Sequence, residues 1–140
     1  MISIYSDGGY SSSRDQGGWA FCIMLDVPVT KYDGLMHTTN NRMEIYGIIK
    51  ALEYVRDNNI KDDITLYTDS MYCIGTLTKG WQMKKNTDLW PILFDLITPN
   101  ITFKHVKGHA GDEGNSLVDR WAVFATQLGG CSKDLGYEAN

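Results

Sequence analysis

Alternating apolar and polar positions predict strands along the first 37 residues. Residues 2–6 alternate and then meet Asp7-Gly8-Gly9, so we expect a strand that ends in a turn at Asp7. Residues 18–25 form a continuously apolar second strand. Residues 29–37 form a third strand, paired with the second through a hairpin. The pattern predicts three neighbouring antiparallel strands.

The period changes to that of a helix over residues 41–58. Its inner face is lined by four residues, Glu44, Ile48, Leu52 and Val55. Cap-type side chains stand just before it: Thr39, Asn40 and Asn41. Glu44 is therefore predicted in the first turn, pointing inward.

The second half of the chain is predicted to add two strands and further helices. Residues 64–68 alternate and run into Asp69, which repeats the placement of Asp7 at a strand end. Helices are expected at 71–78 and 88–97, and a last strand at 101–106. A closing helix is expected to bury Leu117, Trp121, Phe124, Ala125 and Leu128. The order predicts an α/β sandwich with a mixed sheet, in which ligand sites gather at the carboxyl ends of strands.

Length and composition favour one domain. The 140 residues are 43% hydrophobic and 21% charged, enough for one core. We assign residues 1–128 to a catalytic domain and 129–140 to a weakly patterned tail, expected to be disordered at its end. The sequence contains neither an apolar run of bilayer length nor a signal-peptide pattern, so a soluble, cytoplasmic protein is expected. The three scattered cysteines indicate reduced thiols.

Four carboxylates suggest the chemistry. Asp7, Glu44 and Asp69 converge on one sheet edge, and Asp119 near the start of the closing helix can join them. Oxygen-only ligands favour Mg²⁺ or Mn²⁺, and two such ions can promote phosphodiester hydrolysis. Taken singly, each acid also fits turn chemistry or a helix dipole. The net charge of −4 argues against a broad basic nucleic-acid surface, unless acids are committed to cations.

The sequence segments around these acids narrow the predicted function. TNNRME at residues 39–44, VKGHAG at 106–111, and the SDGG and TDS segments resemble, in order and spacing, the ribonuclease H type 1 family over residues 2–126. The resemblance implies a five-stranded mixed sheet, with three antiparallel and then parallel strands, flanked by helices. It implies hydrolysis of the RNA strand of RNA–DNA hybrids by two Mg²⁺ ions (Mn²⁺ being the alternative), leaving 5′-phosphate and 3′-hydroxyl ends.

The resemblance also implies roles for individual residues. The expected metal ligands are Asp7, Glu44, Asp69 and Asp119. His109 is expected to shuttle a proton or aid product release, whereas His37 and His105 are read as surface histidines. Expected contacts to the hybrid are Thr39, Asn40, Asn41, Ser70, Trp81, Lys84 and Lys85.

Three departures from the family pattern concern the substrate surface. The loop at residues 10–18 has a different composition, so Ser12, Ser13 and Arg14 remain open as contacts. Met71 replaces a frequent glutamine. The basic insert is shortened to residues 79–87, which predicts weak or salt-sensitive hybrid affinity and leaves room for a protein partner that supplies it, although a monomer is expected.

Three other functions stay open. Another nuclease of the same fold, such as a junction resolvase, would also cluster acids around two metals. A non-catalytic hybrid-binding or protein-docking module would keep the fold without the chemistry. A structural protein would leave Asp7 and Asp69 at apolar strand ends without an explanation.

Overall fold

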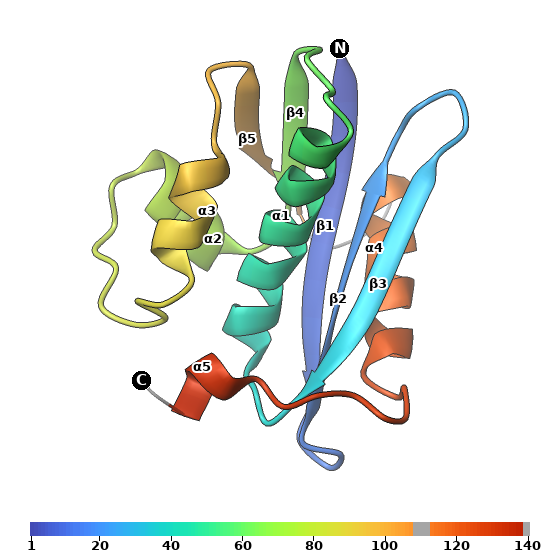
Figure 1. Ribbon diagram of the computed structural model, residues 1–140, viewed down its shortest axis with the longest axis vertical. Coiled ribbons are helices and arrows are strands. Elements are labelled where there is room, and N and C mark those ends of the chain that lie inside the picture. Colours follow the sequence, from blue (N-terminus) through green and yellow to red (C-terminus); the bar gives the residue numbers. More distant parts are fainter. Residues whose placement is uncertain (108–112, 139–140) are drawn as a thin grey trace.

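A central sheet with helices on both faces forms the molecule. The computed structural model describes residues 1–107 and 113–138 (Figure 1). Its strands are β1 (Ile2–Ser11), β2 (Gln16–Ile23), β3 (Val29–Met36), β4 (Ile64–Thr68) and β5 (Ile101–His105). Its helices are α1 (Asn40–Asp57), α2 (Met71–Thr78), α3 (Trp90–Leu96), α4 (Glu113–Ala125) and α5 (Leu135–Glu138).

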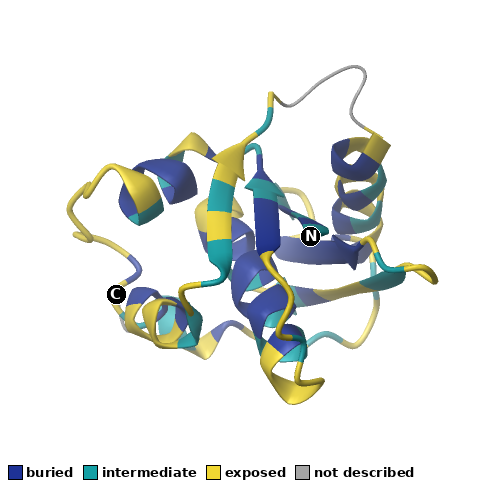
Figure 2. Ribbon diagram, turned by 90° about the horizontal axis from the view of Figure 1, so that it is seen from above, coloured by how far each residue is buried: buried dark blue, intermediate teal, exposed yellow. Residues whose placement is uncertain are grey.

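The strand order is β3-β2-β1-β4-β5, which confirms the predicted five-stranded mixed sheet. The pairs β1–β2 and β2–β3 are antiparallel, while β1–β4 and β4–β5 are parallel. The larger core lies between the sheet and α1, with α3 beside it, and a smaller one lies under α4. Buried segments thus lie where the sheet faces its helices (Figure 2).

The prediction that the first strand ends at Asp7 was wrong. It continues to Ser11, with Asp7 paired to Ala20 of β2, whereas its pairing with β4 stops at Tyr5. The glycine that looked like a turn residue serves close packing instead. A Cβ on Gly8 would lie 2.3 Å from the backbone carbon of Met43 on α1, a distance that side chains do not tolerate.

Helix α1 begins earlier than predicted. Thr39 is its N-cap and accepts a hydrogen bond from the backbone N–H of Arg42 at 3.1 Å, so Asn40 is the first helical residue. The first turn contains no acidic residue. The placement of Glu44 in the first turn was therefore wrong, because the cap lies at the first of three cap-type residues. Its inward orientation is confirmed, since Glu44 is buried.

The inner face of α4 differs from the prediction, which included Phe124 and left out Val118 and Ala122. Phe124 is 47% exposed, and the fully buried side chains are Val118, Ala122 and Ala125. The reason is the short distance between helix and sheet: a Cβ on Gly18 would lie 2.3 Å from the carbonyl oxygen of Ala122. Small residues fill that contact, and a large ring is displaced to its edge.

The segment after α4 lies against the domain. Met36 of β3 forms a bridge with Lys133, and the side chain of Asp134 is buried. The weak apolar pattern of residues 129–140 gave no sign of this contact, because a buried carboxylate holds it. No helix of the described portion is long and apolar enough to cross a membrane.

Candidate active site

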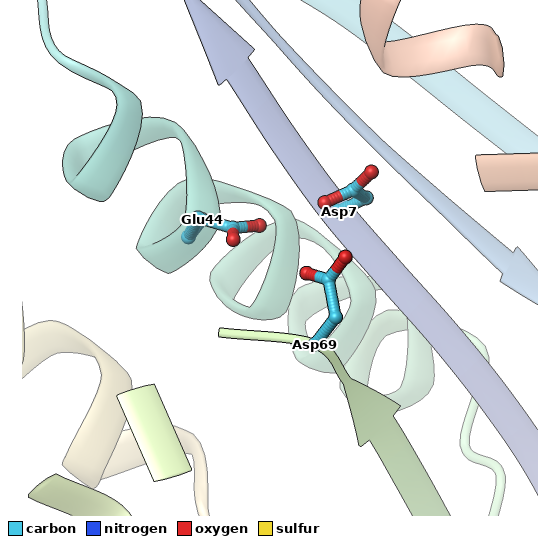
Figure 3. A group of neighbouring side chains, drawn as sticks. All are labelled: Asp7, Glu44 and Asp69. Atoms are coloured by element: carbon cyan, nitrogen blue, oxygen red, sulfur yellow. The ribbon is translucent and has the colours of Figure 1, made fainter. Parts of the chain in front are cut away.

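Three acids from distant parts of the chain meet beside β1. Asp7 lies in the middle of β1, Glu44 on α1, and Asp69 directly after the last residue of β4. Each offers a carboxylate oxygen, and these oxygens lie within 4.8 Å of one another. Figure 3 shows the three carboxylates turned toward a common point.

Two glycines allow α1 to approach β1 closely enough for this meeting. One of them is Gly8, which lies against the backbone of Met43 and Glu44. On the helix side, a Cβ on Gly47 would lie 2.9 Å from the carbonyl oxygen of Asp7. Sequence reasoning missed Gly47, although an isolated glycine inside a helical pattern is a usual sign of close packing.

Asp69 is held by the strand that precedes it and by the helix that follows. The backbone N–H of Ser70 donates to the Thr68 hydroxyl at 3.1 Å, and the Ser70 hydroxyl caps α2 by accepting from the backbone N–H of Cys73 at 3.1 Å. Ser70 is buried, so its described role is that of a cap. Its expected contact with substrate stays a prediction.

His105 is closer to the site than its reading as a surface histidine implied. Its Nε2 lies 3.3 Å from the carbonyl oxygen of Asp69. A carbonyl can only accept, so Nε2 carries the proton in this contact. The side chain is exposed, as expected. The β4–β5 pairing ends at Thr68 and His105, and the contact of the His105 ring with the Asp69 carbonyl adds one more link between the two segments.

The electrostatics of the three acids are unfavourable without a ligand. Burial and then the negative charge of Asp69 raise the pKa of Asp7 to about 8, and the charge of Asp119 acts in the same direction. Burial and then the charge of Asp7 raise the pKa of Glu44 well above its usual value. The Oε1 atom of Glu44 is buried and accepts no hydrogen bond from the described residues.

A hard divalent cation fits this donor set. All the donors are carboxylate oxygens, they repel one another, and one buried oxygen is unsatisfied within the described structure. A cation would neutralise the charge that burial and proximity make costly. The cluster can therefore hold a metal.

The other expected residues lie around this cluster at different distances. Asp119 is exposed on α4. Helix α4 packs on the face of the sheet to which Tyr5 and Asp7 of β1 both point. Among the described residues, Asp119 is not part of the close group of carboxylates. Asn40 and Asn41 are exposed at the start of α1. Trp81, Lys84 and Lys85 are exposed in the connection between α2 and α3. His109 lies outside the described residues.

Trp81 is anchored although it is half exposed. Its ring covers Gly75, where a Cβ would lie 2.0 Å from a ring carbon, and the Lys79 ammonium lies 5.8 Å from the ring centroid. An exposed aromatic ring held next to lysines is a surface on which nucleic acid can stack.

Comparisons with known proteins agree with this fold. The family model for RNase H matches residues 1–127. Ribonuclease H of Rippkaea orientalis is 37% identical over 98% of this chain and 92% of its own length. Ribonuclease H of Ruthia magnifica subsp. Calyptogena magnifica is 39% identical over 89% and 94%, and ribonuclease HI of Synechocystis sp. 35% identical over 90% and 88%.

These comparisons define the class of protein, a ribonuclease of the hydrolase type. More specifically, the chain belongs to the RNase H family. The family resemblance inferred from the TNNRME and VKGHAG segments is thus confirmed.

Proposed function

We propose that this protein hydrolyses the RNA strand of RNA–DNA hybrids at the Asp7–Glu44–Asp69 cluster, with two Mg²⁺ ions, or Mn²⁺ as the alternative. The products are 5′-phosphate and 3′-hydroxyl ends. The observation that carries the proposal is the cluster itself: three buried or half-buried carboxylates within 4.8 Å, built on segments of the RNase H family.

The acids would act by holding cations rather than by moving protons. Asp7, Glu44 and Asp69 supply oxygens from β1, α1 and the end of β4, and we propose that Asp119 of α4 adds a fourth carboxylate. When bound, two cations would supply the positive charge that activates a water and stabilises the leaving oxygen in phosphodiester hydrolysis. We assign His109 the task of moving a proton or aiding product release.

The hybrid would reach the cluster across two exposed segments. Asn40 and Asn41 are exposed at the start of α1, about one helical turn before Glu44. Their side-chain amides can form hydrogen bonds with 2′-hydroxyls, which distinguish RNA from DNA. Thr39 is available there as well, although its hydroxyl caps the helix. On the second segment, Trp81 offers a stacking face, and Lys84 and Lys85 offer charge to phosphates.

A direct test uses a hybrid labelled on its RNA strand. Cleavage is expected with Mg²⁺ and not with EDTA, and the mapped products should carry 5′-phosphates and 3′-hydroxyls. Double-stranded RNA and a branched DNA serve as parallel substrates, because a resolvase of the same fold would prefer the branched one. A protein that binds the hybrid without cutting it under any divalent cation would instead be the non-catalytic module.

We propose that the protein works as a monomer in the cytoplasm, with room for a protein partner that raises hybrid affinity. The short basic segment and the net charge of −4 support the partner, since few lysines are available to neutralise phosphates. Sedimentation with and without hybrid would measure the oligomeric state.

A further inference from the structure

A fully buried arginine lies two residues before Glu44. The side chain of Arg42 is inaccessible to solvent, and each of its five N–H groups meets an acceptor. Nε and one Nη2 hydrogen bond go to Asp134, at 2.7 and 3.0 Å. Two bonds go to Asp88, at 2.9 and 2.7 Å, and one goes to the amide oxygen of Asn86 at 3.2 Å.

These bonds join three segments that are far apart in the sequence. Arg42 belongs to the first turn of α1, which presents Asn40 and Asn41. Asn86 and Asp88 close the connection that presents Trp81 and the two lysines. Asp134 belongs to the segment after α4, which Figure 1 shows crossing from the α4 side to the start of α1. Both proposed hybrid-contacting segments therefore depend on one guanidinium.

The C-terminal segment is fitted closely to this arginine. The Thr38 hydroxyl donates to Asp134 Oδ2 at 2.7 Å, and the backbone N–H of Asp134 donates to the carbonyl oxygen of Met36 at 2.8 Å. At Gly136 a Cβ would lie 2.1 Å from a carboxylate oxygen of Asp88. A segment that only filled space would need neither the paired carboxylate nor a contact this close.

We propose that Asp134 is a positioning residue: through Arg42, the C-terminal segment 129–138 holds the start of α1 and the 79–89 connection in the relative placement that receives the hybrid. This inference rests on the proposed function.

The metal cluster does not depend on this contact. Gly8 and Gly47 already fix the second turn of α1 against β1. Asp7 belongs to the paired strand β1, and Asp69 directly follows the paired strand β4. Loss of Asp134 should therefore impair the binding of substrate and leave the chemistry intact. In kinetic terms KM rises, while kcat and the affinity for Mg²⁺ are maintained.

Asp134→Asn is a suitable variant because Arg42 keeps its two bonds to Asp88, so the buried charge remains paired. We expect KM for the hybrid to rise by roughly three- to tenfold and kcat to change less than about twofold. Thr38→Val is the milder variant: it removes one hydrogen bond to Asp134 and should raise KM by a smaller factor. It also serves if Asp134→Asn does not fold.

Val55→Ala is the matched control. Val55 is buried near the other end of α1, so its truncation destabilises the fold without touching Arg42. All assays are run well below each variant's unfolding midpoint, with Mg²⁺ affinity measured by calorimetry. An unchanged KM in both folded variants, or an equal rise in Val55→Ala, would overturn the proposal while the proposed function stands. If the wild-type chain does not cleave the hybrid, both fall together.

Discussion

Two groups of buried charged residues, one around Arg42 and one around Glu44, lie next to each other on α1. They differ in whether their charges are balanced by opposite charges. Around Arg42, a positive charge meets two carboxylates and an amide, and all its donors are used. Around Glu44, three carboxylates meet, and one buried oxygen of Glu44 has no hydrogen-bond partner among the described residues. The Arg42 network is complete within the protein and holds the chain together. The Glu44 cluster brings together only like charges, which a bound cation would neutralise.

The ionisation of the two groups shows the same difference. Burial by itself lowers the pKa of Arg42, but its hydrogen bonds to Asp88 and Asp134 more than offset that effect and raise the pKa above the usual value. Burial and like charge both raise the pKa of Asp7 and of Glu44. The network stabilises the charged form of Arg42, whereas the cluster disfavours the charged forms of Asp7 and Glu44.

The largest effect should come from removing a carboxylate of the cluster. Asp69→Asn keeps the shape of the side chain and removes its charge, so we expect hybrid cleavage to fall by roughly a hundredfold or more. Hybrid affinity should change little, because the contacts proposed for the substrate lie elsewhere. Cleavage of labelled hybrid and a gel-shift titration measure the two quantities. Undiminished cleavage would exclude this cluster as the active site.

The second effect should come from removing the cation of the network. Arg42→Met leaves Asp134 buried beside Asp88 without a positive partner, so the free energy of unfolding should fall by roughly 3–5 kcal/mol. Urea unfolding followed by circular dichroism measures the loss. Adding Asp134→Asn to this variant should recover part of it, because one uncompensated charge is removed. Equal midpoints for wild type and Arg42→Met would contradict the account.

The third effect has the opposite sign, since Asp7→Asn should stabilise the metal-free protein. The pKa of Asp7 rises from 3.8 to about 8 on folding, so between these values the folded state holds a proton that the unfolded chain has lost. Stability of the metal-free protein therefore falls as pH rises from about 4 to 8. At pH 8 the substitution should add roughly 1–3 kcal/mol, and below pH 4 almost nothing.

Mg²⁺ supplies the control for this third prediction. By binding the folded state it should stabilise the wild type at pH 8 and stabilise Asp7→Asn much less. Thermal melts across pH with EDTA or Mg²⁺ measure both effects. A metal-free wild type whose stability rises steadily from pH 4 to 8 would show that Asp7 is not protonated in the folded state.

The smallest effect concerns charges at the surface. Replacing Lys84 and Lys85 by alanine should weaken hybrid binding a few-fold and make the slope of log affinity against log salt shallower by about 1 per lysine. Lys61→Ala is the control, since this exposed lysine lies beside the far end of α1. Equal slopes for all three proteins would remove the two lysines from the proposed hybrid surface.

Much of the fold could be predicted because periodicity reports burial. The helix at 71–78 and the strand at 64–68 have the predicted bounds. The errors arose where two elements approach closely: Gly8 resembled a turn, and Phe124 resembled a core residue. In both places the deciding quantity is the distance between a helix and the sheet, which no local pattern contains.

The candidate site shows the same division. Asp7, Glu44 and Asp69 could be singled out because carboxylates at predicted strand ends and on an inner helix face contradict the apolar pattern around them. His105 and Asp134 could not, because nothing near them in the sequence marks the carbonyl of Asp69 or the guanidinium of Arg42 as a partner.

The sequence by itself determined the elements, the family and the acids, since each rests on residue type and spacing. The tertiary structure alone decided which charges are paired. Arg42 and Glu44 are two positions apart in similar surroundings along the chain, yet one is satisfied by residues 44 to 92 positions away and the other faces carboxylates of its own sign. Pairing depends on distances across the fold, and those distances are set only when α1 packs against β1 and the C-terminal segment lies over its start.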